Sequence, residues 1–279
     1  MHEWSRFHEV AQSKAAASPV GRLLRQWRSV RRMSQLELAL EAGVSTRHVS
    51  FVETGRSRPS REMVMLLAEV LRVPLRERNA LLEAAGYARF YRETELSDPE
   101  LQQVRSVIEF ILERNEPYSA VAMDRRWNVL MANRPHERMI DRLLGNRSLD
   151  SETSGNLLRL TFDPAGLRPC ILNWEEVART MVDRVHREIG ANPDTESEAL
   201  LEELLSYPGV PERWRMPDLT RPPPVLIPIR LRAEGLELSL FSAITTLGTA
   251  QDVTLQELRI ESFFPADEAT DLAIRAVDP

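Results

Sequence analysis

The first third of the chain repeats apolar residues with the period of an amphipathic helix. Between residues 19 and 92 the apolar positions recur every three or four residues, with short polar breaks, and this pattern predicts helices. Ser34 with Glu37 three positions later has the form of a capping box, and Gly43 is suited to end the helix that begins there. We therefore expect a domain of five helices over residues 19–92, after an N-terminal extension of residues 1–18.

The pattern changes after the acidic segment 93–99, which we interpret as a linker. Short runs that alternate apolar and polar residues predict strands, and runs with the helical period separate them. In chain order the expected elements are a helix ending near Glu116, strands within 119–123 and 127–131, helices within 135–207, a hairpin turning at Glu234–Gly235, a strand within 255–265 and a helix within 267–277. Residues 100–279 are therefore expected to form an α+β domain with an antiparallel sheet.

The charge is distributed unevenly between these two regions. Residues 1–92 carry 16 basic and 9 acidic side chains, whereas the whole chain has a net charge of −6. A basic domain joined to an acidic one indicates that only the first binds a polyanion. The preference for arginine over lysine has a separate explanation, a GC-rich genome, and adds nothing to this argument.

The composition is typical of a soluble globular protein, with 43% apolar and 28% charged residues. The chain has no apolar run long enough for a transmembrane helix and no apolar N-terminal signal, so we expect a cytoplasmic protein that does not enter a membrane. The single cysteine, Cys170, cannot form an internal disulfide.

Residues 34–55 have the residue types that a helix-turn-helix needs at each position. Ala39 is small enough to let the second helix approach, Gly43 supports a turn with positive φ, and Val49 anchors the second helix. The residues expected to complete the buried face are Leu36, Leu40, Val44 and Val52. The outer face of the second helix would then enter the major groove of DNA.

These residues, SQLELALEAGVS followed by VS and ETG, resemble the helix-turn-helix of the phage-repressor type, the xenobiotic-response-element family, over about residues 19–86. The resemblance implies double-stranded DNA as a partner. It implies phosphate contacts by Gln35 and Ser45 and base contacts by Thr46, Arg47 and Phe51. His48 and Ser50 are expected on or near the outer face of the same helix. Arg56 and Arg58, in the loop that follows, are expected to contact the DNA backbone. Arg28 and Glu53 match the structural ion pair of this family. A helical corner that binds no DNA is the alternative.

The rest of the chain lacks the motifs of common enzymes. It contains no glycine-rich nucleotide loop and no nucleophile elbow, and its histidines do not have metal-ligand spacing. His186 and Glu188 have the H-x-E form of a zinc deaminase, but the second cysteine motif of that site is missing. We expect no catalytic residue, no metal ligand and no cofactor, and so a protein that is not an enzyme.

Three segments of this region resemble the ligand-binding domain of the MmyB-like regulators, whose fold is similar to a PAS domain: RRWNVLMAN (125–133), NLLRLTFDP (156–164) and NWEEVAR (173–179). The resemblance covers most of residues 100–265. It implies a fold class of an all-α five-helix helix-turn-helix domain followed by an α+β PAS-like domain, and a small, apolar, fatty-acid-like ligand. One departure is the proline-rich segment 221–231, where many relatives have an H-P-x-x-G-like step.

A sheet covered by helices builds a cavity that suits a small molecule. The large apolar residues that we expect on its wall are Trp127, Trp174, Val177, Met181, Leu204, Trp214, Phe241, Ile244 and Phe263. Each could instead be ordinary core. The function expected is a homodimeric transcription regulator whose ligand modulates operator binding, and the alternative is a DNA-binding regulator whose C-terminal half is a ligand-free dimerisation or protein-interaction module.

Overall fold

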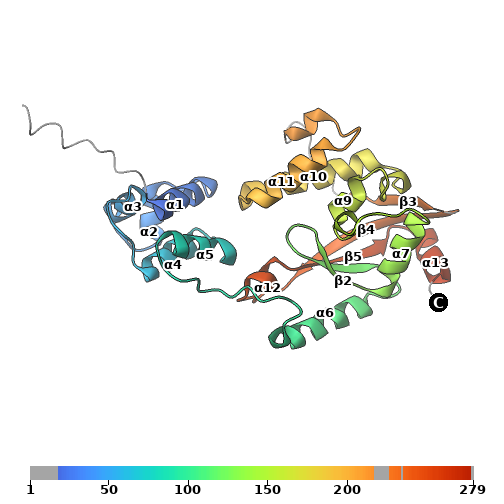
Figure 1. Ribbon diagram of the computed structural model, residues 1–279, viewed down its shortest axis with the longest axis horizontal. Helices are drawn as coiled ribbons and strands as arrows, with labels where there is room; N and C mark the ends of the chain where they lie inside the picture. The colour runs from blue at the N-terminus through green and yellow to red at the C-terminus, as the bar shows by residue number, and fades with distance from the viewer. Residues whose placement is uncertain (1–17, 217–225, 234, 278–279) are drawn as a thin grey trace, which may run out of the picture. The chain divides into compact units, whose positions relative to one another are not determined.

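The computed structural model describes residues 18–216, 226–233 and 235–277. The chain divides into two compact units, Met1–Arg92 and Glu93–Pro279, which are labelled by element in Figure 1. Nearly all of the expected N-terminal extension, residues 221–225 of the proline-rich segment and Glu234 of the expected hairpin turn lie outside the described residues.

The described part of the N-terminal unit contains the five expected helices. They are α1 (Pro19–Val30), α2 (Gln35–Glu41), α3 (Thr46–Glu53), α4 (Arg61–Val70) and α5 (Leu75–Ala84). A serine side chain accepts a hydrogen bond from the first turn of each of the first four, and Ser34 and Glu37 form the expected capping box. Gly43 follows α2 with φ of +65°, so it makes the turn into α3 as expected.

Helices α1 and α3 pack unusually closely because Gly21 has no side chain. A Cβ atom at Gly21 would lie 2.6 Å from the backbone oxygens of both Val52 and Glu53. Ala39 and Val49 are buried in the same core, as the helix-turn-helix pattern predicts. This close contact holds α3, the second helix of the helix-turn-helix, against the rest of the unit.

The buried face predicted for α2 is partly wrong. Leu36 is 56% exposed and Leu40 is 71% exposed, whereas Leu38 and Ala39 are buried. Because each helical residue advances by about 100°, burying Leu38, Ala39 and the following Ala42 turns Leu36 and Leu40 to the side of the helix. Helix α2 has only seven residues, and its apolar pattern was too short to show which side of the helix is buried.

The C-terminal unit combines one five-stranded sheet with helices among its described residues. In chain order it contains η1 (Pro99–Leu101), α6 (Gln102–Arg114), β1 (Ala120–Met123), β2 (Val129–Ala132), α7 (Arg134–Leu144), α8 (Ser151–Ser154), α9 (Leu157–Phe162), η2 (Arg168–Cys170), α10 (Trp174–Ala191), α11 (Thr195–Ser206), η3 (Glu212–Arg215), β3 (Ile229–Ala233), β4 (Leu236–Thr246), α12 (Val253–Glu257), β5 (Arg259–Pro265) and α13 (Glu268–Val277). The expected α+β PAS-like class is confirmed. The short helix α12 was not predicted.

The strands are ordered β2-β1-β5-β4-β3, and every neighbouring pair is antiparallel. The last strand of the chain therefore lies at the centre of the sheet, between β1 and β4. This order brings Val121 of the first strand opposite Glu261 of the last. Residues far apart in the sequence thus share one sheet face.

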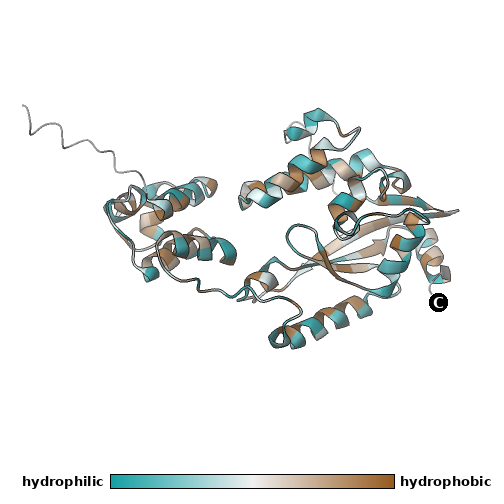
Figure 2. Ribbon diagram, in the orientation of Figure 1, coloured by the Kyte–Doolittle hydropathy of each residue, from teal (hydrophilic) through white to brown (hydrophobic). Residues whose placement is uncertain are grey.

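The two faces of the sheet pack against different helices. Val121 and Met123 of β1 join the large core that includes residues of α7, α9, α10 and α11, whereas Ala120 and Ala122 face α6. Figure 1 shows α6 on one side of the sheet and α9 to α11 on the other. Both faces are therefore covered, in keeping with the mostly hydrophobic colouring of the strands in Figure 2.

Asn133 fixes the start of α7 against the sheet. Its Oδ1 accepts hydrogen bonds from the backbone nitrogens of Ala120 (2.9 Å) and His136 (3.0 Å), and its Nδ2 donates to the carbonyls of Leu112 and Tyr118. The side chain forms the N-cap of α7. Because these bonds use both of its polar atoms, Asn133 places His136 in the first turn of α7, above the sheet.

No helix in the described ranges is both long enough and apolar enough to cross a bilayer.

Candidate DNA-binding face and ligand cavities

A buried ion pair between Arg28 and Glu53 joins α1 to α3 in the N-terminal unit. The Glu53 carboxylate is 1% exposed and accepts from Arg28 Nε at 2.7 Å and Arg28 Nη2 at 3.0 Å. Gln35 Nε2 donates to the same carboxylate at 2.8 Å. Burial alone would raise the pKa of Glu53, but the hydrogen bonds from Arg28 and Gln35 outweigh it and hold that pKa below its ordinary value. The cluster is architectural, and a phosphate contact by Gln35 stays a prediction.

The exposed face of α3 carries two guanidinium groups on one aromatic ring. Arg47 and Arg56 lie over Phe51, with their Cζ atoms 5.0 and 5.8 Å from the ring centre. The backbone nitrogen of Arg56 also donates to the Phe51 carbonyl at 2.8 Å. Phe51 therefore holds a cation of the helix and a cation of the following loop side by side, an arrangement that suits a polyanion.

The other residues predicted to contact DNA differ in the hydrogen bonds that they already make within the protein. Ser45 is exposed and caps α3 by accepting from the His48 backbone nitrogen. Arg58 donates through Nε and Nη2 to the Ala85 carbonyl at 3.2 and 3.0 Å and lies over the Tyr87 ring. Arg58 thus ties the loop after α3 to the end of α5. Thr46 and Ser50 are half-buried, and the backbone contact predicted for Arg58 stays a prediction.

The C-terminal unit contains a first cavity, the hairpin cavity, between α7, the β3–β4 hairpin and α13. It encloses about 700 Å³, including the space at its mouth, and most of its lining side chains are aliphatic. Its lining includes Arg138, Met139, Arg142, Leu143, Leu231, Leu238, Leu240, Phe263 and Ile274. Arg142 Nε is buried and has no hydrogen-bond acceptor among the described residues.

A second cavity, the central cavity, lies between α7, α9, α10 and the sheet. It encloses about 580 Å³, again including its mouth. The side chains that line both cavities are Met139, Leu143, Leu231, Leu240 and Phe263. The two cavities are therefore neighbours that share part of their walls.

Two polar side chains of the central cavity are almost fully buried. Glu261 and His136 are each 6% exposed. Burial raises the pKa of the Glu261 carboxyl above its ordinary value, although a hydrogen bond with Ser242 opposes this shift. Burial also lowers the pKa of His136 to about 4, so its imidazole is neutral at pH 7. Groups with such shifts in a cavity are candidates for ligand contact.

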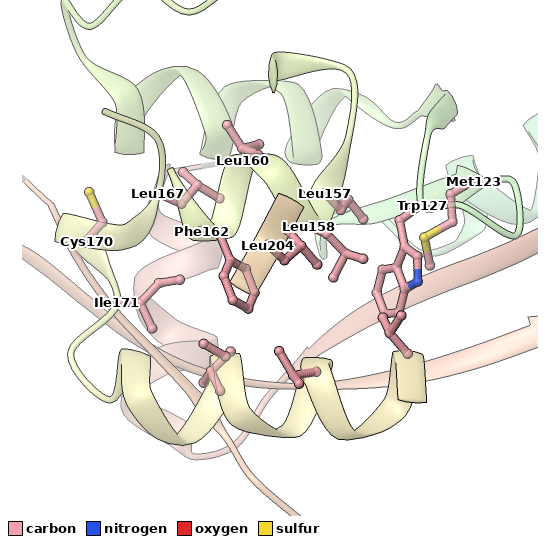
Figure 3. Close-up of a cluster of buried hydrophobic side chains, with 14 of the residues drawn as sticks. Met123, Trp127, Leu157, Leu158, Leu160, Phe162, Leu167, Cys170, Ile171 and Leu204 are labelled. Atoms are coloured by element: carbon pink, nitrogen blue, oxygen red, sulfur yellow. The ribbon is translucent and has the colours of Figure 1, made fainter. Parts of the chain in front are cut away.

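The structure separates the nine predicted wall residues into three groups. Trp127, Val177, Met181 and Phe263 line the central cavity, and Phe263 also lines the hairpin cavity. Trp174, Leu204 and Trp214 belong to the packed core around α9 to α11 and line neither cavity. Figure 3 draws Leu204 among Leu158 and Phe162 in this core.

The third group is Phe241 and Ile244, which line neither cavity. The Phe241 ring pairs with Phe264 at 5.7 Å, and neither belongs to the face that forms the cavities, since Leu240 and Phe263 are there instead. Ile244 is on the cavity side of β4 but near the end of the strand, and it is exposed. Their predicted role at a ligand has no support from the geometry.

The comparison with known families concerns both units. Residues 104–276, well over half of the chain, match the family model described as MmyB-like transcription regulator ligand binding domain. The chain belongs to this family. Residues 24–78 match a second model, described as helix-turn-helix. The expected pair of domain types is therefore confirmed, and both family descriptions indicate a DNA-binding transcription regulator instead of an enzyme.

A curated relative agrees with this assignment. The chain is 29% identical over 115 residues to a Bacillus subtilis (strain 168) protein described as uncharacterized HTH-type transcriptional regulator RghRB. The aligned region covers 40% of this chain and 81% of that relative.

Within the MmyB-like domain, sequence reasoning missed the polar residues of the cavities. Glu261 is two positions before Phe263 on β5, so strand alternation alone would have placed it on the same face as that predicted wall residue. His136 is three positions after the helix cap Asn133. No metal site formed by three or more His, Cys, Asp or Glu side chains is found among the described residues.

Proposed function

We propose that this protein is a cytoplasmic, sequence-specific transcription regulator whose operator affinity is modulated by a small fatty-acid-like ligand in the C-terminal unit. The observation that carries the proposal is the pair of neighbouring apolar cavities in a domain of a ligand-binding family. A well-packed domain contains few voids larger than a water molecule. A sphere the size of a water molecule can place its centre within about 70 Å³ of the hairpin cavity and about 60 Å³ of the central cavity, whereas a single water needs about 10–15 Å³. Two neighbouring cavities of this size on one sheet face therefore favour a bound ligand over a filled interaction module.

The hairpin cavity suits the head of an acyl chain. Arg138 and Arg142 are one helical turn apart on α7 and line this cavity, and the buried Arg142 Nε lacks an acceptor among the described residues. A carboxylate between these guanidinium groups would gain charge-assisted hydrogen bonds. The aliphatic residues of both cavities would then surround the chain.

The DNA contacts follow from the exposed face of α3. Arg47 would contact a guanine and Thr46 a neighbouring base edge, with Phe51 beside them. Ser45 and Gln35 would approach phosphates, and the helix N-terminus would assist them because its free backbone N–H groups attract anions. Arg47 is exposed, as a base contact requires.

A homodimer would bind two half-sites one helical turn of DNA apart, and its affinity would exceed that of one helix-turn-helix. The described surface offers apolar side chains for such a contact, since Val107 and Phe110 lie exposed one turn apart on α6. The ligand can modulate DNA binding only if it binds one arrangement of the dimer better than another.

The test measures operator affinity with and without ligand. Purified protein is freed of lipid, its DNA site is obtained by selection from random duplexes, and binding is followed by fluorescence anisotropy while hexadecanoic acid is titrated. We expect the fatty acid to change the DNA dissociation constant several-fold. The Leu143→Trp variant, which places a larger side chain in the wall that both cavities share, should bind DNA normally and lose this response.

Two outcomes would count against the proposal. If hexadecanoic acid binds the wild-type protein but leaves DNA affinity unchanged, the C-terminal unit does not modulate operator binding. If no fatty acid binds and the delipidated protein still dimerises, the ligand-free dimerisation module is the better account.

A further inference from the structure

The central cavity has a chemistry that a plain hydrocarbon chain does not need. Most of its lining side chains are apolar, but Glu261 and His136 also face it. The hydroxyl of the third polar residue, Thr161, donates to the Leu157 carbonyl at 2.7 Å and is therefore already satisfied. The polar capacity that remains in this cavity belongs to Glu261, His136 and the indole N–H of Trp127, which is buried and has no hydrogen-bond partner among the described residues.

Within the described part of the chain, no ion pair neutralises Glu261. The two arginines that influence it, Arg184 and Arg259, both bind the Glu188 carboxylate, at 2.9 and 2.7 Å. The hydrogen-bond partner of the Glu261 side chain among the described residues is Ser242. A carboxyl group accepts and donates more bonds than one serine can provide. Leucine or methionine would fill the same position on β5 without the cost of burying a carboxyl group.

His136 is held in one orientation and keeps one nitrogen available. Its Nδ1 lies 2.9 Å from Ser119 Oγ, and its ring faces Phe263 with 6.4 Å between ring centres. No partner for Nε2 is found among the described residues. Because the serine hydroxyl can rotate, either neutral tautomer of the ring can be accommodated, so Nε2 can donate or accept.

Buried polar groups without partners are rare in native proteins, and each calls for an explanation. A ligand chain that entered the central cavity with a bare methyl end would displace any water there. Glu261 would then keep its bond with Ser242 and His136 its bond with Ser119, but their other bonding positions would stay unused. That loss costs affinity. A chain that carried a hydroxyl group would restore a donor and an acceptor at once.

We propose that the central cavity recognises a hydroxyl group, or a similarly small neutral hydrogen-bonding group, on the distal part of an acyl chain whose head lies in the hairpin cavity. Glu261 and His136 are the specificity-determining residues. The inference rests on the proposed function, because it assigns the ligand class of the same site. It makes the preferred ligand a hydroxylated acyl chain and not an unsubstituted fatty acid.

The positions of the polar side chains in the two neighbouring cavities support this arrangement. Arg138 and Arg142 line the hairpin cavity, whereas Glu261 and His136 line the central one. Met139 lines both, and a methionine side chain adapts its shape easily. A ligand that spans both spaces therefore meets cations at one end and neutral hydrogen-bonding groups at the other.

The experiment compares matched pairs of ligands in the full-length, delipidated protein. Isothermal titration calorimetry gives the affinities of saturated fatty acids from octanoic to hexadecanoic acid and of their ω-hydroxy counterparts. We expect the best hydroxy acid to bind the wild-type protein about tenfold more tightly than its parent acid, the gain of one well-made buried hydrogen bond.

Three variants assign the preference to Glu261. Glu261→Leu should lose or reverse the preference for the hydroxy acid, whereas Glu261→Gln, which keeps a hydrogen-bonding side chain, should retain much of it. Glu237→Gln, which changes an exposed carboxyl on the neighbouring strand β4, is the matched control and should leave both affinities unchanged. Circular dichroism checks that each variant folds.

The outcomes separate this inference from the proposed function. Equal binding of both acids by the wild-type protein, or an equal preference in the wild type and Glu261→Leu, would overturn the inference and leave the fatty-acid sensor standing. If neither acid of any length binds, the proposed ligand class is itself wrong, and the inference fails with it.

Discussion

The two units each bury a glutamate, and the two carboxyl groups behave in opposite ways. Glu53 is 1% exposed and receives hydrogen bonds from Arg28 and Gln35, which hold its pKa down despite burial. Glu261 is 6% exposed, faces a cavity, and its pKa is raised by burial. A buried charge that the fold satisfies is part of the architecture, whereas a buried polar group that the fold leaves open marks a site.

The contrast has consequences for stability at different pH. Because the pKa of Glu53 is lowered in the folded state, its contribution is complete above the unfolded pKa and is lost as pH falls through the folded pKa. The raised pKa of Glu261 has the opposite effect, since the folded state keeps a proton that the unfolded state releases. Its cost therefore appears as pH rises above about 4.5.

The largest effect on stability is expected when the Glu53 carboxylate, which is hydrogen-bonded by Arg28 and Gln35, is removed. Glu53→Ala should destabilise the N-terminal unit by about 3 kcal/mol, because it leaves the Arg28 guanidinium partly buried without its partner. Chemical denaturation followed by circular dichroism measures this, with Glu41→Ala on the exposed side of α2 as the control. If both variants lose the same free energy of unfolding, the ion pair does not stabilise the unit, and the contrast between Glu53 and Glu261 fails.

The DNA-binding face extends the comparison to cations. Arg28 is satisfied by Glu53, whereas Arg47 is stacked on Phe51 and has no carboxylate or carbonyl acceptor among the described residues. Arg47→Ala should therefore leave stability unchanged and reduce affinity for the selected DNA site by about 2 kcal/mol. Anisotropy titrations with specific and random duplexes measure both affinities.

Arg56→Ala provides the partner experiment, because its guanidinium shares the Phe51 ring but lies in the loop after α3. It should weaken binding to both duplexes alike and reduce the salt dependence by about one unit. Equal losses on specific and random DNA for both variants would show that Arg47 does not contact a base.

The second buried group of the central cavity gives a pH test of similar size. The pKa of His136 is lowered from 6.5 to about 4 in the folded state, so the unfolded chain takes up a proton first as the pH falls. The wild-type protein should lose about 2 kcal/mol of stability between pH 7.5 and pH 5 through this residue. His136→Gln should lack that contribution. Parallel denaturation curves for both proteins over this pH range would contradict it.

The smallest effect is expected when the Glu261 carboxyl group, which has no ion-pair partner among the described residues, is removed. Glu261→Leu should stabilise the ligand-free C-terminal unit by about 1 kcal/mol at pH 8, because an apolar side chain replaces a carboxyl that is costly to ionise there. At pH 5 the gain should be smaller, since the wild-type carboxyl keeps more of its proton. A loss of stability at pH 8 would mean that the fold satisfies Glu261 as fully as it satisfies Glu53.

The sequence predicted local features of the backbone, but it did not separate cavity-lining side chains from core side chains. The cap at Ser34 and the turn at Gly43 were predicted correctly, because each depends on the backbone within a few residues of itself. The wall residues Val177 and Phe263 were separated from core residues such as Leu204 only by the packed structure. All three look alike in an apolar pattern.

The sequence by itself determined the helix-turn-helix and the strands, because local backbone preferences and the apolar period specify them, and its motifs indicated the two domain types through their resemblance to known families. The tertiary structure alone decided that β5 enters the centre of the sheet and that Glu261 thereby faces α7 across a cavity. A cavity is the space left between surfaces that belong to distant segments, and no single segment encodes its volume. The family resemblance had already paired Glu53 with Arg28, whereas only the fold shows that Glu261 is buried beside a cavity without an ion-pair partner among the described residues.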